Sequence, residues 1–555
     1  MSSRKLLPFA LLAISAGVFA QQAPSAGSQM QQIPPAPLPQ KLPPKIEIQP
    51  AGAPVAAAAE SIKIVVNSLN VTGAQVYSAS DLIALSGFRP GSEMTLSDLR
   101  GMANKIAAYY HQNGYFVAQA YLPAQDINGG AVTIAVIEGR YSKVTLQNQS
   151  KLSDAVAERL LVGLNSGDLI ASEPLESRLL LLSDIPGVQV KSTLLPGTTA
   201  GTSELIVNIV PGKTLSGEVD IDNAGNRYTG EYRLGTTLNL NNLAGLGDVA
   251  SLRAMTTGSE LSYGRASYQL PFGRATAGVA YSYLDYSLGR EFESLGAHGT
   301  AKIASVFGSY SLIRSRNTNL YARLTLDDKT FHDKVDLTSS ITDKKARALT
   351  ASLAGEHRDK FAAGGVSAFS LAWTSGNLNI QTDTQRAIDA VTARSNGHYN
   401  KLGFSAMRLQ NLTDTLSLYG AVSGQFASKN LDVSEKMSLG GMYGVRAYPE
   451  GEAYADQGYL ATVEARLMLP NFSDQMSGRL QLIAFADSGT VTIDKNPWVA
   501  TANRRTLSGA GIGFNWTDPD NFMVRAYWAH QLGNQAALSA PDKSGRFWIQ
   551  AVKYF

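Results

Sequence analysis

An arginine and an aspartate in the C-terminal part of the chain have side chains suited to a charged, two-point contact. Arg446 lies in "SLGGMYGVRAYPEGEAYADQGY", residues 438–459, a segment with five glycines between two alternating runs. Asp487 lies in the run "LQLIAFADSGTV", residues 480–491. A guanidinium can bind a carboxylate through two parallel hydrogen bonds, which lysine cannot do. The pair therefore indicates attachment of a loop; the alternative for Arg446 is a solvated loop charge.

Residues for covalent, acid–base or metal chemistry are not grouped in the sequence. The six histidines are scattered without paired spacing: His111, His298, His332, His357, His398 and His530. Neither Gly-x-Ser-x-Gly nor His-Glu-x-x-His is present, and there is no cysteine to act as a nucleophile or metal ligand. We therefore predict no catalytic residue, no metal site and no cofactor, and an enzyme remains only a remote alternative.

Length and charge limit the class of protein. The chain has 555 residues, which is more than one core usually holds, so at least two domains are expected. The formal net charge is +3, which gives no support for a nucleic-acid partner.

The N-terminus has the features of an export signal. Arg4 and Lys5 precede the apolar run "LLPFALLAISAGVFA", residues 6–20, which ends in small residues before Gln21. The alternative, a membrane anchor, needs a longer run of about 20 apolar residues. Residues 1–20 are therefore predicted to be a signal peptide that is removed on export.

A proline-rich segment follows the signal. Residues 21–59 contain nine prolines, against twelve in residues 60–555. Such a segment favours extended polyproline geometry and cannot bury a core, so we predict a periplasmic linker. Residues 21–33 show no convincing amphipathic helix.

Two units with the same order of secondary-structure elements come next, residues 60–139 and 140–212. Each reads as strand, helix, helix, strand, strand, which predicts two tandem α/β modules. In the first unit, Thr95 and Asp98 form the pattern of a capping box before a helix over 96–114.

Residues 213–555 change to period-two alternation. In "YLATVEARLML", residues 459–469, one face carries Tyr, Ala, Val and Leu, and the other carries Thr462, Glu464 and Arg466. The chain ends inside the strand "RFWIQAVKYF" at Phe555. A soluble sandwich also alternates, but the even strand count and this ending favour a transmembrane barrel of 16 antiparallel strands. The sixteen strands are predicted to begin near residues 216, 232, 249, 261, 275, 301, 318, 345, 364, 398, 416, 458, 478, 504, 521 and 545.

This topology places Arg446 on a loop between strands eleven and twelve, the sixth extracellular loop, at about 431–457. Alternation in 480–491 directs Phe485 and Asp487 into the lumen. A carboxylate inside a barrel favours a cationic partner. We therefore expect the loop to fold into the barrel, with Arg446 and Asp487 as its anchor.

These residues carry a family resemblance. "GVRAYPEGEAYADQGYL" resembles the sixth-loop segment of the two-partner secretion transporters, the TpsB family, which secrete and activate hemolysins and adhesins. "AFADSG", residues 484–489, resembles the strand motif that pairs with it in that family. The resemblance assigns supporting roles to Val445, Tyr448, Phe485 and Gly489. Ala447 stands where the superfamily usually has glycine, which bears on the local backbone because alanine tolerates positive φ poorly.

The resemblance extends over about residues 60–555. Segment 109–141 resembles the first periplasmic POTRA module of these transporters, 219–248 resembles the start of their barrel, and 268–273 resembles a following turn. The resemblance implies an outer-membrane channel with POTRA modules in the periplasm. An unfolded, β-rich TpsA-type exoprotein would bind the modules, pass through the barrel and fold outside, without nucleotide hydrolysis.

The resemblance also implies outer-membrane lipids as partners, and periplasmic chaperones and the barrel-assembly machinery during biogenesis. An insertion or assembly factor of the same superfamily is the alternative function. Two modules, fewer than assembly factors typically have, favour secretion. The sequence leaves open which module edge binds the client.

Overall fold

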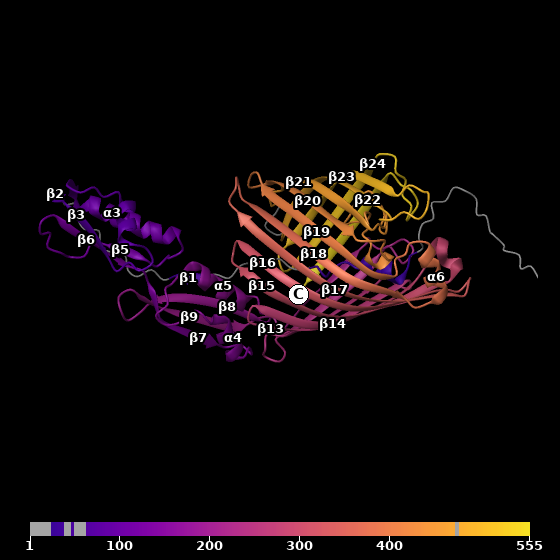
Figure 1. The fold of residues 1–555 in the computed structure, drawn as a ribbon, viewed down its shortest axis with the longest axis horizontal. Coiled ribbons are helices and arrows are strands. Elements are labelled where there is room, and N and C mark those ends of the chain that lie inside the picture. The colour runs from indigo at the N-terminus through magenta and orange to yellow at the C-terminus, as the bar shows by residue number, and fades with distance from the viewer. Residues whose placement is uncertain (1–23, 38–45, 49–62, 472–476) are drawn as a thin grey trace, which may run out of the picture.

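The computed structural model describes residues 24–37, 46–48, 63–471 and 477–555. The predicted signal peptide, residues 1–20, lies outside these ranges. Two small α/β modules lie at one end of the molecule, and a barrel forms the rest (Figure 1). No helix in the described ranges is long and apolar enough to cross a lipid bilayer.

The first module has five strands where three were predicted. Its sheets have the orders β3-β6-β5 and β2-β4. Strand β4 lies between the two helices and pairs with β2. The single strand expected over 62–73 is divided into β2 and β3. Thr95 and Asp98 form the expected capping box at the start of α3. The elements are β2 (Lys63–Val66), β3 (Ser68–Thr72), α2 (Ala79–Ser86), β4 (Ser92–Thr95), α3 (Leu96–Gln112), β5 (Gln119–Tyr121) and β6 (Ala131–Ile137).

The second module has the predicted element order and gains a strand from the N-terminal segment. Its own elements are β7 (Arg140–Asn148), α4 (Asp154–Leu161), α5 (Ser172–Ser183), β8 (Val188–Pro196) and β9 (Thr202–Pro211). β1 (Ile46–Ile48), which falls in the proline-rich segment, pairs in parallel with residues 192–194 of β8. The sheet therefore has the order β1-β8-β9-β7.

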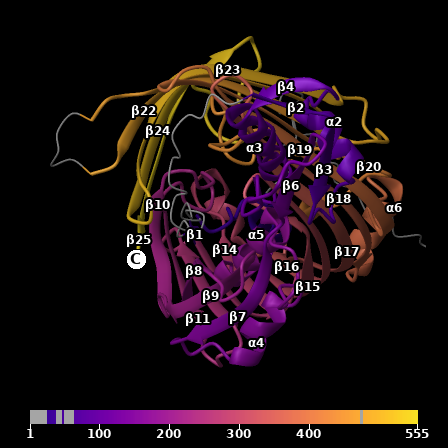
Figure 2. The ribbon, with the colours of Figure 1, turned by 90° about the vertical axis from the view of Figure 1, so that its left-hand side faces the viewer.

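The second module lies against one end of the barrel (Figure 2). The guanidinium of Arg314 donates two hydrogen bonds to Asp184, of 2.7 and 2.8 Å. Arg316 lies 3.1 Å from Glu176 of α5. These contacts orient the module under the barrel opening.

Sixteen antiparallel strands close into the barrel, as predicted. Each strand begins within about five residues of the expected position. The barrel closes between β10 and β25 through five residue pairs, fewer than at any other strand pair of the barrel. The strands are β10 (Leu215–Asp222), β11 (Arg233–Asn241), β12 (Val249–Thr256), β13 (Leu261–Phe272), β14 (Ala275–Ser287), β15 (Ala297–Arg314), β16 (Thr318–Val335), β17 (Ser340–Asp359), β18 (Gly365–Ile380), β19 (Gly397–Asn411), β20 (Leu416–Ala427), β21 (Gln457–Met468), β22 (Arg479–Thr492), β23 (Arg504–Asp518), β24 (Phe522–Leu532) and β25 (Gly545–Tyr554).

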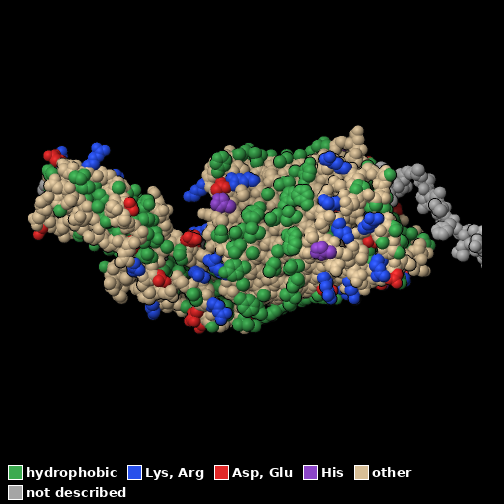
Figure 3. Space-filling view, in the orientation of Figure 1, with side chains coloured by type: hydrophobic (Ala, Val, Ile, Leu, Met, Phe, Trp, Pro, Cys, Tyr) green, Lys and Arg blue, Asp and Glu red, His purple; other side chains and the backbone are tan. Residues whose placement is uncertain are grey.

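The two faces of the strands differ as the alternation predicts. On β22, Leu482 points outward with 43% of its surface exposed, whereas Asp487 points inward and is 2% exposed. Hydrophobic side chains form a band across the outer barrel surface (Figure 3). Lysine and arginine gather beyond this band, toward the end that carries α6 (Asp383–Val391). A 3-10 helix, η1 (Arg290–Leu295), lies in another loop at that end.

The expectation of no helix in residues 21–33 is wrong. Helix α1 (Ala26–Gln31) contacts β14, β15, β16 and the 3-10 helix η2 (Val433–Glu435) inside the barrel. The backbone N–H of Ala26 donates to Asp333 Oδ1 at 2.7 Å, and Gln29 Oε1 accepts from Thr229 Oγ1 at 2.6 Å. A six-residue helix is not stable alone, so its formation depends on this burial and not on a local pattern. Residues 26–31 therefore lie within the barrel and not in a periplasmic linker.

Candidate functional site

The loop between β20 and β21, residues 428–456 and here called loop 6, folds back into the barrel. Leu439, Val445 and Tyr448 are fully buried. They pack in one cluster with side chains of the barrel wall, including Phe485 and Trp548. An apolar loop core of this kind holds the glycine-rich segment in the lumen.

Arg446 reaches the wall at Asp487. Its Nε donates to Asp487 Oδ2 and its Nη2 donates to Asp487 Oδ1, both at 2.8 Å, and its backbone N–H donates to Oδ2 at 3.2 Å. Thr462 Oγ1 donates to Asp487 Oδ1 at 2.9 Å. The structure thus brings together the two residues singled out as an anchor, with a two-point geometry that lysine cannot reproduce.

A second carboxylate, Glu464 on β21, completes the guanidinium site. Arg446 Nη1 lies 2.8 Å from Glu464 Oε1, and Arg466 lies 2.7 Å from Glu464 Oε2. The sequence placed Glu464 on the lumen face but did not assign it to the anchor. The only signal in the sequence was the lumen-facing position of Glu464, because nothing local in β21 indicates which cation pairs with this carboxylate.

Two aromatic rings cover the guanidinium. Its central carbon lies 3.5 Å from the centroid of the Phe485 ring and 5.0 Å from that of Tyr527. Burial disfavours the charged form of Arg446, but Asp487 and Glu464 outweigh this effect and raise its pKa. Arg446 is therefore a fixed positive charge held by two carboxylates and two π-faces.

Two hydrogen bonds hold the loop at the arginine and two residues after it. Trp548 Nε1 donates to the carbonyl oxygen of Arg446 at 2.7 Å, and the Tyr448 hydroxyl donates to the carbonyl of Gln535 at 2.8 Å. A side chain at Gly489 would come within 2.7 Å of Leu439. Gly489 therefore lets the loop approach its strand closely.

Ala447 fits the loop without positive φ, which removes the difficulty expected from the missing glycine. Its methyl group faces Gly509 on β23, where an added Cβ would lie 2.5 Å from the Ala447 Cβ. The absence of a side chain at Gly509 therefore provides the space for the Ala447 methyl group.

Further ion pairs attach loop 6 around the lumen, and none of them was predicted. Glu452, with no exposed surface, pairs with Arg505 and accepts 2.6 and 2.8 Å hydrogen bonds from the hydroxyl and N–H of Ser539. The remaining pairs to other segments are Asp432 with Lys344, Glu435 with Lys329 and Lys401, and Lys436 with Asp494. Lys436 also pairs with Asp456 within the loop. The loop is therefore held by ion pairs as well as by its apolar core, and these pairs reach β16, β17, β19 and β23.

A cavity of about 560 Å³ adjoins the anchor, with Arg466, Arg525, Tyr443 and Tyr527 among its lining residues. Tyr443, at the loop tip, is 51% exposed and accepts a 2.9 Å hydrogen bond from Arg525 Nη2. Within the described ranges no group of three or more His, Asp or Glu has a metal-binding arrangement. His111 instead contacts the carbonyl oxygen of Ala118 at 2.7 Å.

The comparisons with known proteins identify this architecture. The family model described as "Haemolysin secretion/activation protein ShlB/FhaC/HecB" matches residues 201–516. The chain belongs to the ShlB/FhaC/HecB family. A second model, "POTRA domain, ShlB-type", matches residues 64–139. This family is the one that the loop and strand motifs resemble.

The similarity to individual relatives covers most of this chain. The heme/hemopexin transporter protein HuxB of Haemophilus influenzae is 32% identical over 472 residues, covering 84% of this chain and 82% of HuxB. The outer membrane transporter CdiB of Dickeya dadantii is 27% identical, covering 65% of each chain. The solved structure of CdiB from Escherichia coli has the same fold, with a TM-score of 0.70 at 20% identity, covering 91% of this chain and 93% of that one.

As a ShlB/FhaC/HecB-family member, the protein is an outer-membrane transporter of the TpsB type and not an enzyme. Its POTRA modules lie in the periplasm, as in the family. The loops at the α6 end, loop 6 included, therefore connect on the extracellular side.

Proposed function

We propose that this transporter recognises one large, β-rich TpsA-type exoprotein in the periplasm and secretes it through its barrel. The observation that carries the proposal is that two non-barrel segments, α1 and loop 6, lie in the lumen and are attached to its wall by polar contacts as well as apolar packing. Thr229 and Asp333 hold α1, and Asp487 holds loop 6. Neither segment belongs to the closed ladder of strands β10 to β25, so both can leave the path of a client without opening the barrel wall.

The β8 edge of the second module supports a docking site for the client. β1 already pairs with this edge through Ser192, Thr193 and Leu194. An edge that accepts one extended segment can accept another by strand addition, with backbone hydrogen bonds providing affinity. We therefore assign client docking to β8, where the client replaces β1.

Proline substitutions test the docking site. Thr193→Pro removes a backbone donor from β8 and is expected to reduce secretion while the barrel stays folded. Gln147→Pro in β7, the opposite edge of the same sheet, is the matched control. Equal secretion by the two variants would exclude β8 as the docking edge.

Chemical crosslinking tests transport through the lumen. The chain has no cysteine, so Gln29→Cys with Thr229→Cys provides a single pair of thiols at a 2.6 Å side-chain contact. A bifunctional thiol reagent that joins them should block secretion, and a cleavable reagent should restore it after cleavage. Full secretion from the crosslinked protein would contradict passage through this lumen.

We infer the client's class from the names of the relatives. The relatives with the heme/hemopexin transporter name have higher identity to this chain than the CdiB relatives. This supports an exoprotein client that binds heme or hemopexin. Co-expression with candidate exoproteins, followed by assay of the culture medium for heme and hemopexin binding, tests the assignment. Accumulation of inserted barrel proteins instead of a released exoprotein would favour the assembly-factor alternative.

A further inference from the structure

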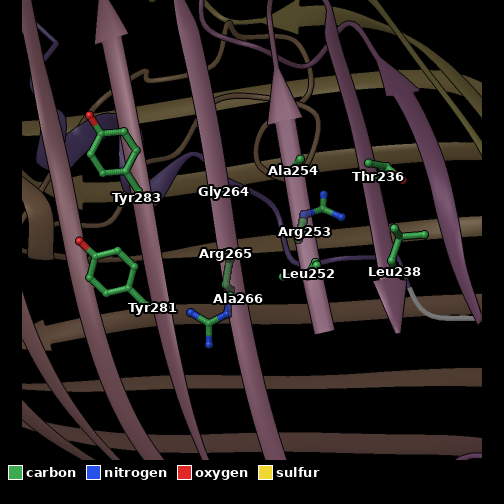
Figure 4. Close-up of a pocket in the computed structure, with 10 residues that line it drawn as sticks. All are labelled: Thr236, Leu238, Leu252, Arg253, Ala254, Gly264, Arg265, Ala266, Tyr281 and Tyr283. Carbon is green, nitrogen blue, oxygen red and sulfur yellow. The ribbon is translucent and has the colours of Figure 1, made fainter. Parts of the chain in front are cut away.

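A groove lies on the outer surface of the barrel, away from the lumen. Its volume is about 420 Å³, and residues from four adjacent strands, β11 to β14, line it (Figure 4). The lining side chains that alternate outward are Thr236, Leu238, Leu252, Ala254, Gly264, Ala266, Tyr281 and Tyr283. Their neighbour Arg253 points the other way and contacts Glu218 inside the barrel.

The strand register organises the groove into two adjacent rows. One row is Thr236, Ala254, Gly264 and Tyr283, and the other is Leu238, Leu252, Ala266 and Tyr281. Small residues form the floor, and a Cβ built at Gly264 would meet no atom within 4 Å. Leu252 and Tyr281 are 55% and 49% exposed, so they rise on either side of an unfilled hollow.

The surroundings of this groove determine what can occupy it. Its volume falls in the range of sites for small molecules, and its walls are aliphatic and aromatic. It opens on the face of an outer-membrane barrel that contacts lipid, so the molecule available to fill it is a lipid acyl chain.

A positive charge lies beside the groove, in line with the row that contains Gly264 and Tyr283. Lys302 on β15 pairs across the strands with Tyr283, and its Nζ lies 5.9 Å from the centre of the Tyr283 ring. β14 runs from the module end outward, so Tyr283 lies on the extracellular side of Tyr281, and Lys302 extends the extracellular row of the groove. Tyrosine is common near the polar headgroup region, and lysine attracts an anionic headgroup.

We propose that this groove binds a phosphorylated glycolipid of the outer leaflet, of the lipid A type. One acyl chain lies over Gly264 and Ala266 between the leucine and tyrosine walls, and a phosphate contacts Lys302. Asp285, two residues beyond Tyr283 on β14, bounds the headgroup site with a negative charge that opposes the phosphate.

Filling the groove tests the acyl-chain contact. Gly264→Leu places a side chain in the hollow, and Gly420→Leu is the control. Gly420 on β20 likewise has no atom within 4 Å of a built Cβ, and its partner Val463 is 61% exposed on the outer face. The full chain in nanodiscs, titrated with lipid A and followed by native mass spectrometry, should show a roughly tenfold loss of affinity for Gly264→Leu only. Gly264→Val serves the same purpose if the larger side chain prevents barrel folding, which heat-shifted electrophoretic mobility reports.

Charge changes test the headgroup contact. Lys302→Ala should weaken lipid A binding, and Asp285→Asn should strengthen it. Lys345→Ala is the control, because Lys345 lies on the same row two strands away from Lys302. Three outcomes would each overturn the proposal and indicate non-specific contact with bulk lipid only. They are equal binding by Gly264→Leu and Gly420→Leu, equal losses of binding for Lys302→Ala and Lys345→Ala, and equally strong competition by phosphatidylglycerol.

Discussion

Arg446 and Asp487, 41 positions apart in the chain, are joined by two hydrogen bonds of 2.8 Å inside the barrel. Both side chains are almost fully buried. Removing one partner of a fully desolvated pair costs about 3–5 kcal/mol, because the other charge is left without a partner. Water in the adjacent lumen lowers that cost, so loss of this contact should release the loop more than it destabilises the barrel.

The anchor predicts an order of secretion defects. Arg446→Ala should lower secretion roughly tenfold or more. A loss of ~1.4 kcal/mol already shifts the equilibrium between seated and released loop 6 tenfold. Asp487→Ala should have a larger effect than Glu464→Ala, because Asp487 accepts two guanidinium hydrogen bonds and Glu464 shares its charge with Arg466. Secretion of a reporter client and electrophoretic mobility of the folded barrel measure the two effects separately.

A double-mutant cycle checks that these residues act together. Arg446→Ala with Asp487→Ala should be little worse than Arg446→Ala alone, as expected for a coupled pair. Arg446→Lys should remain defective, because it keeps the charge but loses the two-point contact. Strictly additive defects would show that the two residues act separately.

The contact between Ala447 and Gly509 predicts a compensating pair. Gly509→Ala should displace loop 6 and raise channel conductance, because its Cβ would lie 2.5 Å from that of Ala447. Adding Ala447→Gly removes one of the two methyl groups and should restore the closed channel. Planar-bilayer recordings of the single and double variants give the answer, and an unchanged single variant would contradict the predicted clash.

The raised pKa of Glu450 predicts that loop 6 is held more stably in the lumen in mild acid than at alkaline pH. Burial raises the pKa of Glu450 to about 7, although Arg233 attracts the carboxylate. Its neutral form is therefore favoured in the seated loop, and its contribution is lost as the pH rises from about 4.5 through 7. Glu435 has a pKa lowered to about 2 because its lysine partners outweigh burial, so it stays charged from pH 5 to 8.

The measurement is channel conductance at pH 5 and pH 8. The wild-type channel should open more often at pH 8, and Glu450→Gln should reduce this difference by keeping the position neutral at both values. The pKa of Asp456 is also raised by burial, so a part of the pH dependence should remain in the variant. A variant with an unreduced difference would exclude Glu450 as its source.

The orientation predicts which thiols are accessible from outside. Val391→Cys, on α6 and 77% exposed in the wild-type chain, should react with a membrane-impermeant maleimide on intact cells. Ser150→Cys, in the second module, should react only after the outer membrane is permeabilised. Labelling of Ser150→Cys on intact cells would reverse the topology.

Much of the fold follows from local patterns in the sequence. Alternation has a period of two, so it identifies each strand and the face of Glu464 or Asp487 without knowledge of the partner strand. The Thr95–Asp98 capping box is also local, because the two side chains lie within one turn. The same reasoning placed Arg446 on the loop between strands eleven and twelve.

What the tertiary structure alone decided are the contacts between segments far apart in the chain. Helix α1 is too short to be stable alone and forms because Asp333 and Thr229 meet it, about 307 and 200 residues away. β1 becomes a strand only where β8 offers an open edge, and Glu464 becomes a ligand of Arg446 only once loop 6 enters the lumen. In each case the stabilising partner is absent from the local sequence, so no local periodicity can reveal it.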